Sequence, residues 1–394
     1  MTASPIAPPA VLDALIVGAG PVGLAAGCAL RAAGLDVIVA DAGPAARALD
    51  DARVIALSAG SRDILRTLRA WPASGSTPIR RIHISQRGHF GRTELRNEDY
   101  GLDALGHVAQ LGTLVRALRE RAQALALDVR HDTAVGAARA DGEVMRVPVG
   151  GTDVTARVVL WCEGRITDDE ALSRTRDYGQ HAVIALATPV RAHDSVAYER
   201  FTPDGPVALL PCGRDYAVVF TCASADSAAL LAETDAQFAA RLAAVLGERV
   251  QFSAIGPRSA WPLALRMRAD IVRGHEAWLG NAAQTLHPVA GQGLNLALRD
   301  VAQLADCLLP ALARHEGGID SALQRYARLR RTDRAATGGF TDALVRLFGL
   351  GADDAALGAL AGHARGAALA LLDALPPARR FIGRRMMFGA RAWP

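Results

Sequence analysis

One segment near the N-terminus limits the possible folds more than any other. An apolar run from Leu12 to Val17 leads into Gly18-Ala19-Gly20-Pro21-Val22-Gly23. An alanine- and leucine-rich stretch then ends at Gly34, and a second apolar run ends at Asp41. Short apolar runs bounded by turn residues are typical of buried parallel strands, and the stretch between them has a helical composition. We therefore predict a strand–helix–strand unit over residues 12–41.

The G-x-G-x-x-G spacing in this unit predicts a dinucleotide site. Gly18 permits a tight turn, Gly20 lets backbone approach a pyrophosphate, and Gly23 allows the helix to pack closely on the strand. The start of the helix offers free N–H groups to phosphate. Asp41 would accept hydrogen bonds from a ribose diol and repel a 2′-phosphate, so FAD or NAD is expected, and this segment does not decide between them. The predicted contacts are Gly18, Ala19, Gly20, Pro21, Val22, Gly23 and Asp41.

A second glycine cluster decides for FAD. Residues 278–300 read WLGNAAQTLHPVAGQGLNLALRD, in which Gly291 and Gly293 would let backbone N–H groups approach a ring at the start of a helix. This segment resembles the flavin-contacting segment of class A flavoprotein aromatic hydroxylases. Its GNAAQTLHP version, with residues 53–58, 81–91, 198–211 and 330–334, is similar to the UbiH-like ubiquinone-biosynthesis hydroxylases. The likeness extends over nearly the whole chain.

The resemblance implies an α/β fold of the para-hydroxybenzoate-hydroxylase type. A Rossmann-like FAD-binding domain would comprise residues 1–75, 95–172 and 256–345. Short strand-like runs separated by turn pairs predict an inserted antiparallel-sheet substrate domain over residues 76–94 and 173–255. Residues 346–394 would form a helical C-terminus.

The resemblance also implies the chemistry and the cofactor contacts. NAD(P)H would reduce FAD, O2 would form a C4a-hydroperoxide, and the ring of a polyprenyl-phenol would be hydroxylated in ubiquinone biosynthesis, in a site that excludes water. In addition to the residues of the first glycine-rich loop, the expected FAD contacts are Arg53, Gln110, Glu163, Gly164, Gly280, Asn281, Pro288, Gly291, Gln292, Gly293, Leu294 and Asn295.

Two positions leave alternatives open. His287 precedes a proline beside the expected flavin loop, so it is either a base toward the phenol or a structural residue that holds the loop. At Glu163-Gly164 the chain departs from the family, which has an Asp-Gly pair followed by a serine. This departure favours either a tolerated exchange or a flavin-binding, catalytically weak accessory protein of a biosynthetic assembly. Hydroxylation of another small phenol is a further alternative.

Composition excludes several other classes. All 44 basic residues are arginine, so lysine chemistry is absent, and a net charge of +4 does not favour nucleic acid as a partner. The five cysteines are far apart and suggest neither disulfides nor a metal site. The N-terminus lacks the pattern of a signal peptide and no uncharged apolar stretch is long enough to span a membrane, which predicts a cytoplasmic protein.

The C-terminal segment is basic and amphipathic. Residues 378–393 interleave five arginines with Phe, Ile, Met and Trp side chains, and such a helix can lie on an anionic membrane surface or on its own domain. Because a polyprenyl-phenol partitions into the bilayer, we expect this helix to bind the inner membrane face peripherally, or to bind other ubiquinone-biosynthesis proteins.

Overall fold

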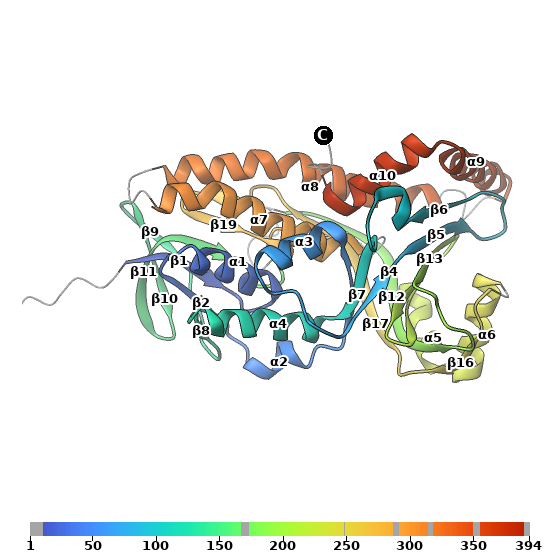
Figure 1. Ribbon diagram of the computed structural model, residues 1–394, viewed down its shortest axis with the longest axis horizontal. Helices are drawn as coiled ribbons and strands as arrows, with labels where there is room; N and C mark the ends of the chain where they lie inside the picture. Colours follow the sequence, from blue (N-terminus) through green and yellow to red (C-terminus); the bar gives the residue numbers. More distant parts are fainter. Residues whose placement is uncertain are drawn as a thin grey trace, which may run out of the picture.

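The computed structural model describes residues 11–166, 173–247, 249–286, 291–313, 318–349 and 355–389. The chain forms two halves side by side, each built on one large sheet, with long helices along the edge that joins them (Figure 1). The half at the left of Figure 1 contains both glycine-rich segments.

The first half is centred on a sheet in the order β18–β19–β11–β1–β2–β8, in which β19, β11, β1, β2 and β8 run parallel. The apolar runs of β1, β2 and the end of β11 are buried on both sides, as a parallel sheet requires. The strands are β1 (Leu12–Val17), β2 (Val37–Ala40), β8 (Asp128–Arg130), β9 (Arg139–Asp141), β10 (Val144–Val149), β11 (Thr152–Trp161), β18 (Val272–Arg273) and β19 (Glu276–Trp278). The predicted strand–helix–strand unit over residues 12–41 is confirmed.

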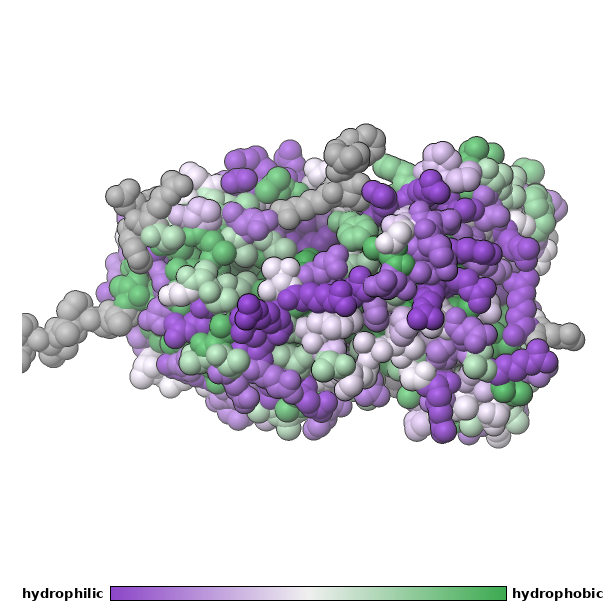
Figure 2. Space-filling model, viewed as in Figure 1, coloured by the Kyte–Doolittle hydropathy of each residue, from purple (hydrophilic) through white to green (hydrophobic). Residues whose placement is uncertain are grey.

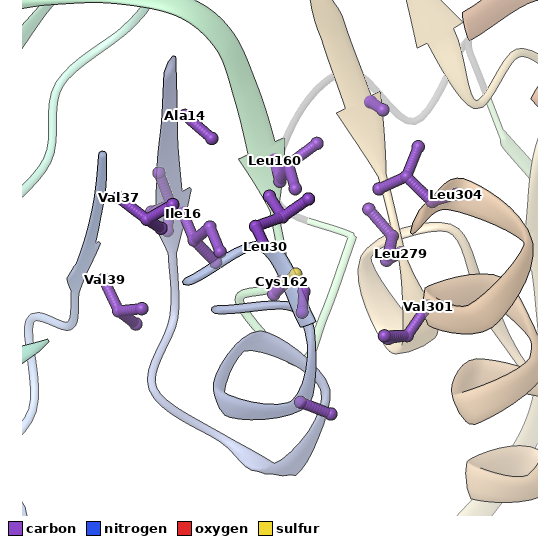
Figure 3. Packing of buried hydrophobic residues seen from close by; sticks show 14 of the residues in the cluster. Ala14, Ile16, Leu30, Val37, Val39, Leu160, Cys162, Leu279, Val301 and Leu304 are labelled. Atoms are coloured by element: carbon purple, nitrogen blue, oxygen red, sulfur yellow. The ribbon is translucent and has the colours of Figure 1, made fainter. Parts of the chain in front are cut away.

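Helices cover this sheet and complete its core. Helix α1 packs against α4 and α7, and α7 lies beside α8 along the upper edge in Figure 1. Side chains from β1, β2, β11, α1 and α7 meet in one buried apolar cluster, which Figure 3 shows around Ile16, Leu30, Leu160 and Val301. The helices are α1 (Pro21–Ala32), α2 (Ala45–Leu49), α3 (Ala59–Thr67), α4 (Leu111–Ala124), α7 (Gln292–Ala313) and α8 (Ile319–Gly349).

A three-stranded antiparallel sheet lies between the halves. It has the order β3–β7–β4, with β3 (Val54–Ser58), β7 (Gly106–Gln110) and β4 (Ser76–Ile79). The 3-10 helix η1 (Asn97–Tyr100) precedes β7. Strand β3 also contacts α7, so this small sheet touches the elements that carry the second glycine cluster.

The second half is one sheet in the order β20–β17–β12–β15–β14–β13–β5–β6, with β16 on β12. Every neighbouring pair is antiparallel except β13 with β5, so the predicted antiparallel sheet is present with one parallel pair. The strands are β5 (Arg81–Gln86), β6 (Arg92–Arg96), β12 (Ser173–Pro189), β13 (Val196–Thr202), β14 (Gly205–Cys212), β15 (Asp215–Ala223), β16 (Phe252–Ile255), β17 (Ser259–Arg268) and β20 (Gln284–Thr285).

One face of this sheet is covered by α5 (Ser227–Ala232) and α6 (Asp235–Leu246), which pack an apolar cluster against β12, β14 and β15. Thr234 caps α6: its hydroxyl accepts the backbone N–H of Gln237, and the Gln237 side chain accepts the N–H of Thr234. The opposite face looks toward the first half.

Strands cross three of the limits predicted for the two domains, whose boundaries stay a prediction. Strands β17 (to Arg268) and β20 belong to the second sheet although they lie beyond the limit predicted at 255, because β17 pairs with β12 and β20 pairs with β17. Strand β4, over residues 76–79, belongs to the small sheet with β3 and β7 and not to the second sheet. Strand β6 ends at Arg96, past the predicted limit at 94. Long-range strand pairing, which local sequence does not encode, sets all three limits.

The last two described helices are α9 (Ala355–Ala374), which lies over the second half, and α10 (Pro376–Phe388), which lies above the junction of the two halves (Figure 1). Helix α9 packs on β6, and α10 packs on α3 and α9. In the described part of the chain, none of the helices combines the length and apolar composition needed to cross a membrane.

Candidate functional site

Four segments meet at the carboxyl edge of the parallel sheet. They follow β1, β2, β11 and β19 in turn, and backbone hydrogen bonds join them: Cys162 N–H donates to Val17 O at 2.7 Å, and Leu279 N–H donates to Trp161 O at 3.0 Å. Ligands of open α/β sheets bind at this edge. The two glycine-rich segments of the sequence are therefore brought to one place.

The turn after β1 has the geometry of a phosphate-binding loop. Gly18 takes a φ of +107°, and a Cβ there would lie 2.5 Å from the carbonyl oxygen of Cys162. A Cβ on Gly23 would overlap the carbonyl oxygen of Gly18, so both positions need glycine for packing. A Cβ on Gly20, by contrast, would meet nothing of the chain within 4 Å. Helix α1 begins at Pro21 without a side-chain cap, so no capping side chain satisfies its first backbone N–H groups. These groups lie beside the open space at Gly20 and can bind phosphate there.

Asp41 stands at the end of β2 beside this loop. Its Oδ2 accepts the N–H of Ala19 at 2.6 Å, and its Oδ1 accepts the N–H of Gly43 at 2.7 Å. These bonds fix the carboxylate, and each oxygen keeps a second lone pair for another donor. The arrangement suits a ribose diol, as predicted from the sequence.

Gly280 and Asn281 follow β19 and form the 3-10 helix η4 (Gly280–Ala282). A Cβ on Gly280 would lie 3.0 Å from the side chain of Val22 and 3.4 Å from that of Ala297, so this segment packs on α1 and α7. Asn281 is exposed at the same edge. It can therefore reach a ligand that lies on the loop after β1.

Helix α7 begins at Gln292, directly after Gly291. Gly291 has a φ of +59°, and a Cβ there would lie 3.2 Å from the Cβ of Ala56 on β3. Gly293, in the first turn, would place its Cβ in open space, and Gln292 is largely buried. The positive end of α7 and Leu294 thus lie beside the small sheet, where a bound ring would lie against backbone.

Asn295 holds this helix start in place through its side chain. Its Oδ1 accepts the N–H of Ser58 at 2.8 Å and the hydroxyl of Ser61 at 2.6 Å. Its Nδ2 donates to the carbonyl oxygens of Ala56 at 2.9 Å and Gly291 at 2.7 Å. The amide is thereby fully engaged within the chain, so a contact from Asn295 to a cofactor would have to come from its backbone.

Arg53 and Gln110 lie next to each other, since Val54 of β3 is paired with Gln110 of β7. The Arg53 guanidinium binds the carboxylate of Asp51, with NH2 2.6 Å from Oδ2, and lies 5.6 Å from the ring centre of Trp261. The Asp51 side chain raises the pKa of Arg53. Gln110 is exposed at the start of α4. Both side chains can reach solvent at the junction of the two halves.

Glu163 and Gly164 follow β11 and are exposed at the same edge as the loop after β1. Gly164 takes a φ of +79°, which a glycine adopts without strain. The preceding Cys162 is buried, and burial raises the pKa of its thiol, so it is inert. His287 and Pro288 lie outside the described residues, and the role predicted for each stays a prediction.

A buried ionic network behind α7 was not predicted from the sequence, although residues 330–334 were part of the family likeness. Arg330 is fully buried; its Nε donates to Asp300 at 2.5 Å and its NH1 donates to Asp333 at 2.7 Å. Asp300 also accepts Gln284 Nε2 at 2.8 Å, and Gln284 Oε1 accepts Arg334 Nε at 2.7 Å. The network ties α7 to α8 and to the segment after β19. No local sequence pattern signals it, because its members are up to 50 residues apart.

These observations fit FAD. The open position beside Gly20, the oriented Asp41 carboxylate and the starts of α1 and α7 form a cradle, and the close packing behind it at Gly18 and Gly23 requires glycine. Among the described residues, no three His, Cys, Asp or Glu side chains gather as metal ligands would.

Comparison with known proteins agrees with this geometry. Residues 11–337 match the family described as "FAD binding domain". The chain is 32% identical to "Ubiquinone hydroxylase UbiL" of Rhodospirillum rubrum over 96% of this chain and 90% of that protein. It is 29% identical to "3-demethoxyubiquinol 3-hydroxylase" of Escherichia coli, over 81% and 85%. The structure superposes on p-nitrophenol 4-monooxygenase PnpA of Pseudomonas putida with a TM-score of 0.76 at 15% identity, covering 98% and 100% of the chains.

Proposed function

Because this chain belongs to the FAD-binding-domain family and is an FAD-dependent aromatic-ring hydroxylase, we propose that it hydroxylates the ring of a polyprenyl-phenol in ubiquinone biosynthesis. NAD(P)H serves as the reductant and O2 as the second substrate. The observation that carries the proposal is the similarity to a ubiquinone hydroxylase over nearly the full length of both chains. The two glycine-rich segments, joined at one sheet edge, support the cofactor assignment.

The bound flavin supplies the oxidising power, by activating O2 after its reduction. The chain supplies position and charge. The N–H groups at the start of α1 would hold the pyrophosphate, Asp41 would orient the ribose, and Asn281 would hydrogen-bond a ribityl hydroxyl or the pyrophosphate. The positive end of α7 would stabilise negative charge on a flavin ring held at Gly291 and Gly293.

The substrate ring would lie between the small sheet and the inner face of the second sheet. Ala56, Val108 and Ala197 pack together where the two sheets meet, which keeps this region apolar and excludes water. A polyprenyl tail needs such an apolar path.

The direct test is spectroscopic. Purified holoenzyme is mixed anaerobically with NADH or NADPH, with and without a short-chain prenylphenol. We expect bleaching of the flavin that the phenol accelerates, followed by a hydroxylated phenol when O2 is admitted. Bound FAD that stays oxidised in every mixture would contradict the proposal and would favour the accessory role suggested by Glu163.

A pair of glycine variants tests the cofactor site separately. Gly20→Ala places a methyl group in the open space beside the start of α1, and we expect FAD affinity to fall at least about tenfold with the fold retained. Gly339→Ala is the matched control, because Gly339 in α8 also has no atom within 4 Å of its Cβ position. Equal flavin content in the two variants would overturn this placement of the pyrophosphate.

We also propose that α9 and α10 bind an anionic phospholipid surface. Exposed apolar side chains gather on this end of the molecule, where Figure 2 shows hydrophobic residues over α9 at the upper right. Leu360, Leu371, Leu375 and Phe381 are 46–69% exposed. Helix α10 has four arginines and no acidic residue, and Arg380 and Arg384 are exposed. Apolar contact beside positive charge matches an anionic bilayer surface.

Close packing orients the apolar face of α9 outward. Gly362 and Gly366 lie against the loop between β5 and β6, where a Cβ on Gly366 would overlap the carbonyl oxygen of Phe90. Gln86 Nε2 also donates to the carbonyl oxygen of Gly362 at 2.8 Å. The glycine side of α9 therefore faces the protein.

Vesicle sedimentation tests this surface. We expect Leu371→Asp, or deletion of residues 379–394, to reduce binding to phosphatidylglycerol vesicles severalfold. Leu231→Asp, at an exposed leucine of α5, is the control and should leave binding unchanged. Unchanged binding in the deletion would reject the surface, and binding to purified pathway proteins without lipid would favour a protein partner instead.

A further inference from the structure

The second sheet carries one carboxylate in the centre of its inner face. Glu199 on β13 is paired in register with Ile84 of β5 and Ala208 of β14. The same row continues through Val219 of β15 to Ile184 of β12. Residues paired in this way project from the same face of a sheet, so the row places Glu199 among apolar side chains.

This face looks toward the predicted flavin segment. Ala197, two residues before Glu199 and on the same face, packs with Val108 of β7 and Ala56 of β3. Ala56 in turn lies against Gly291 at the start of α7. Glu199 is therefore one row beyond the contact that joins the two halves. At the other end of β13, Phe201 is paired with Gln86, whose side chain binds α9.

The row around Glu199 is more accessible than the neighbouring positions on the other face of the sheet. There, Val207, Val218 and Val183 are fully buried beneath α6. On the inner face, Glu199 and its four row neighbours each keep part of their surface accessible, although they lie in the middle of the sheet. Side chains of α5 and α6 therefore cover one face of the sheet more completely than the described residues cover the other, and the substrate ring is placed on the less covered face.

One oxygen of this carboxylate is unpaired within the described part of the chain. Oε1 of Glu199 is buried and has no hydrogen-bond partner there. Burial alone raises the pKa of this carboxyl to about 7. The neighbouring same-face positions do not titrate: they are Ile82, Ile84 and Gln86 on β5, Pro206, Ala208 and Leu210 on β14, and Val54, Ala56 and Val108 on β3 and β7.

A buried, unpaired acceptor costs free energy, so its presence on the open face of a binding site points to a ligand donor. Resting on the proposed function, we propose that Glu199 accepts the proton of the substrate's phenolic hydroxyl. The O–H bond breaks, its electron pair stays on the oxygen and is shared with the ring, and the proton bonds to a Glu199 carboxylate oxygen. The ring gains electron density where it is hydroxylated, and the proton later leaves to water.

The test uses the holoenzyme and Glu199→Gln, which keeps the shape and a hydrogen-bond acceptor but takes up no proton. We expect kcat for a prenylphenol to fall about 10²- to 10⁴-fold, the usual contribution of a general base. The wild-type rate should rise with pH through about 7 as Glu199 loses its proton, and this rise should vanish in the variant. Glu94→Gln is the control, because Glu94 is paired with His83 and projects from the opposite face.

A second readout needs no turnover. A prenylated 4-nitrophenol is bound to oxidised holoenzyme without reductant, and its yellow phenolate is titrated. A neighbouring carboxylate disfavours a second negative charge, so the bound phenol should ionise about one pH unit higher in the wild type than in Glu199→Gln. Glu94→Gln should titrate as the wild type does.

The two proposals fail in different ways. Equal kcat values and equal nitrophenol titrations in Glu199→Gln and the wild type would overturn the role of Glu199 while leaving the hydroxylase assignment intact. A wild-type enzyme that hydroxylates no prenylphenol would overturn the proposed function. The nitrophenol titration would still report whether Glu199 lies beside a bound hydroxyl.

Discussion

Two regions of this protein bury charge, and they do so in opposite ways. Behind α7, Asp300, Arg330 and Asp333 are almost completely buried and each forms ion pairs within the network. On the inner face of the second sheet, Glu199 is surrounded by apolar side chains and its Oε1 has no partner in the described part of the chain. In the first arrangement Asp300, Arg330 and Asp333 pair with one another, whereas the second leaves one acceptor for a donor outside the chain.

The difference separates structural charge from functional charge. The desolvation of a buried ion is compensated only by close partners, so the network stabilises one packing of α7 on α8. An acceptor without a partner lowers stability, and a fold retains it where a ligand supplies the missing donor. Substitutions in the network should therefore lower stability. Substitution of Glu199 should lower activity without lowering stability.

The largest effect on stability is expected in the network. Asp300→Ala leaves the Arg330 cation buried with one carboxylate partner, and we expect the free energy of unfolding to fall by about 3–5 kcal/mol. Urea unfolding at a fixed FAD concentration measures it. Asp141→Ala, which removes the exposed pair with Arg146, should cause no measurable change. Similar small losses in both variants would contradict the distinction between the regions.

Ionised Glu199 should lower the free energy of unfolding, whereas the ion pairs of the network raise it. Because the pKa of Glu199 in the folded protein is about 7 and its ordinary value is 4.5, the folded state binds this proton more tightly. Stability should therefore fall between about pH 4.5 and 7, by roughly 3 kcal/mol, and level off above that range. Glu199→Gln should lack this fall, so the variant gains on the wild type as pH rises. Parallel pH profiles for the two proteins would refute it.

A smaller effect is expected for a member of the network that is only partly paired. Arg299 Nε donates to Asp333 at 2.9 Å, but its two terminal nitrogens are buried and have no partner among the described residues. Arg299→Met removes one charged hydrogen bond together with two unsatisfied groups, so we expect a loss of about 1 kcal/mol in the same urea assay. A loss as large as that of Asp300→Ala would show that these two nitrogens contribute to the stability of the folded protein.

Much of the cofactor-binding half was predictable because its signals are local. The turn from Gly18 to Gly23 and the position of Asp41 depend on chain segments of about 30 residues, in which glycine spacing and apolar runs directly reflect backbone requirements. Helix α4 over Leu111–Ala124 also follows a local apolar pattern, in which Leu114, Val115 and Leu118 are buried. The second sheet was predictable as short antiparallel strands, but its limits were not, since pairing of β12 with β17 joins segments about 80 residues apart.

What the sequence by itself determined is the FAD loop, the second glycine segment and the family, because each depends on residue types at fixed short spacings. Only the tertiary structure decided which polar side chains are paired. Asn295, expected to contact the cofactor, is held by Ser58, Ser61, Ala56 and Gly291, and Glu199, unremarkable in the sequence, stands unpaired on an open sheet face. Whether a polar side chain has a hydrogen-bond or ion-pair partner depends on which side chains come into contact in the folded protein. The spacing of residues along the chain does not encode these contacts.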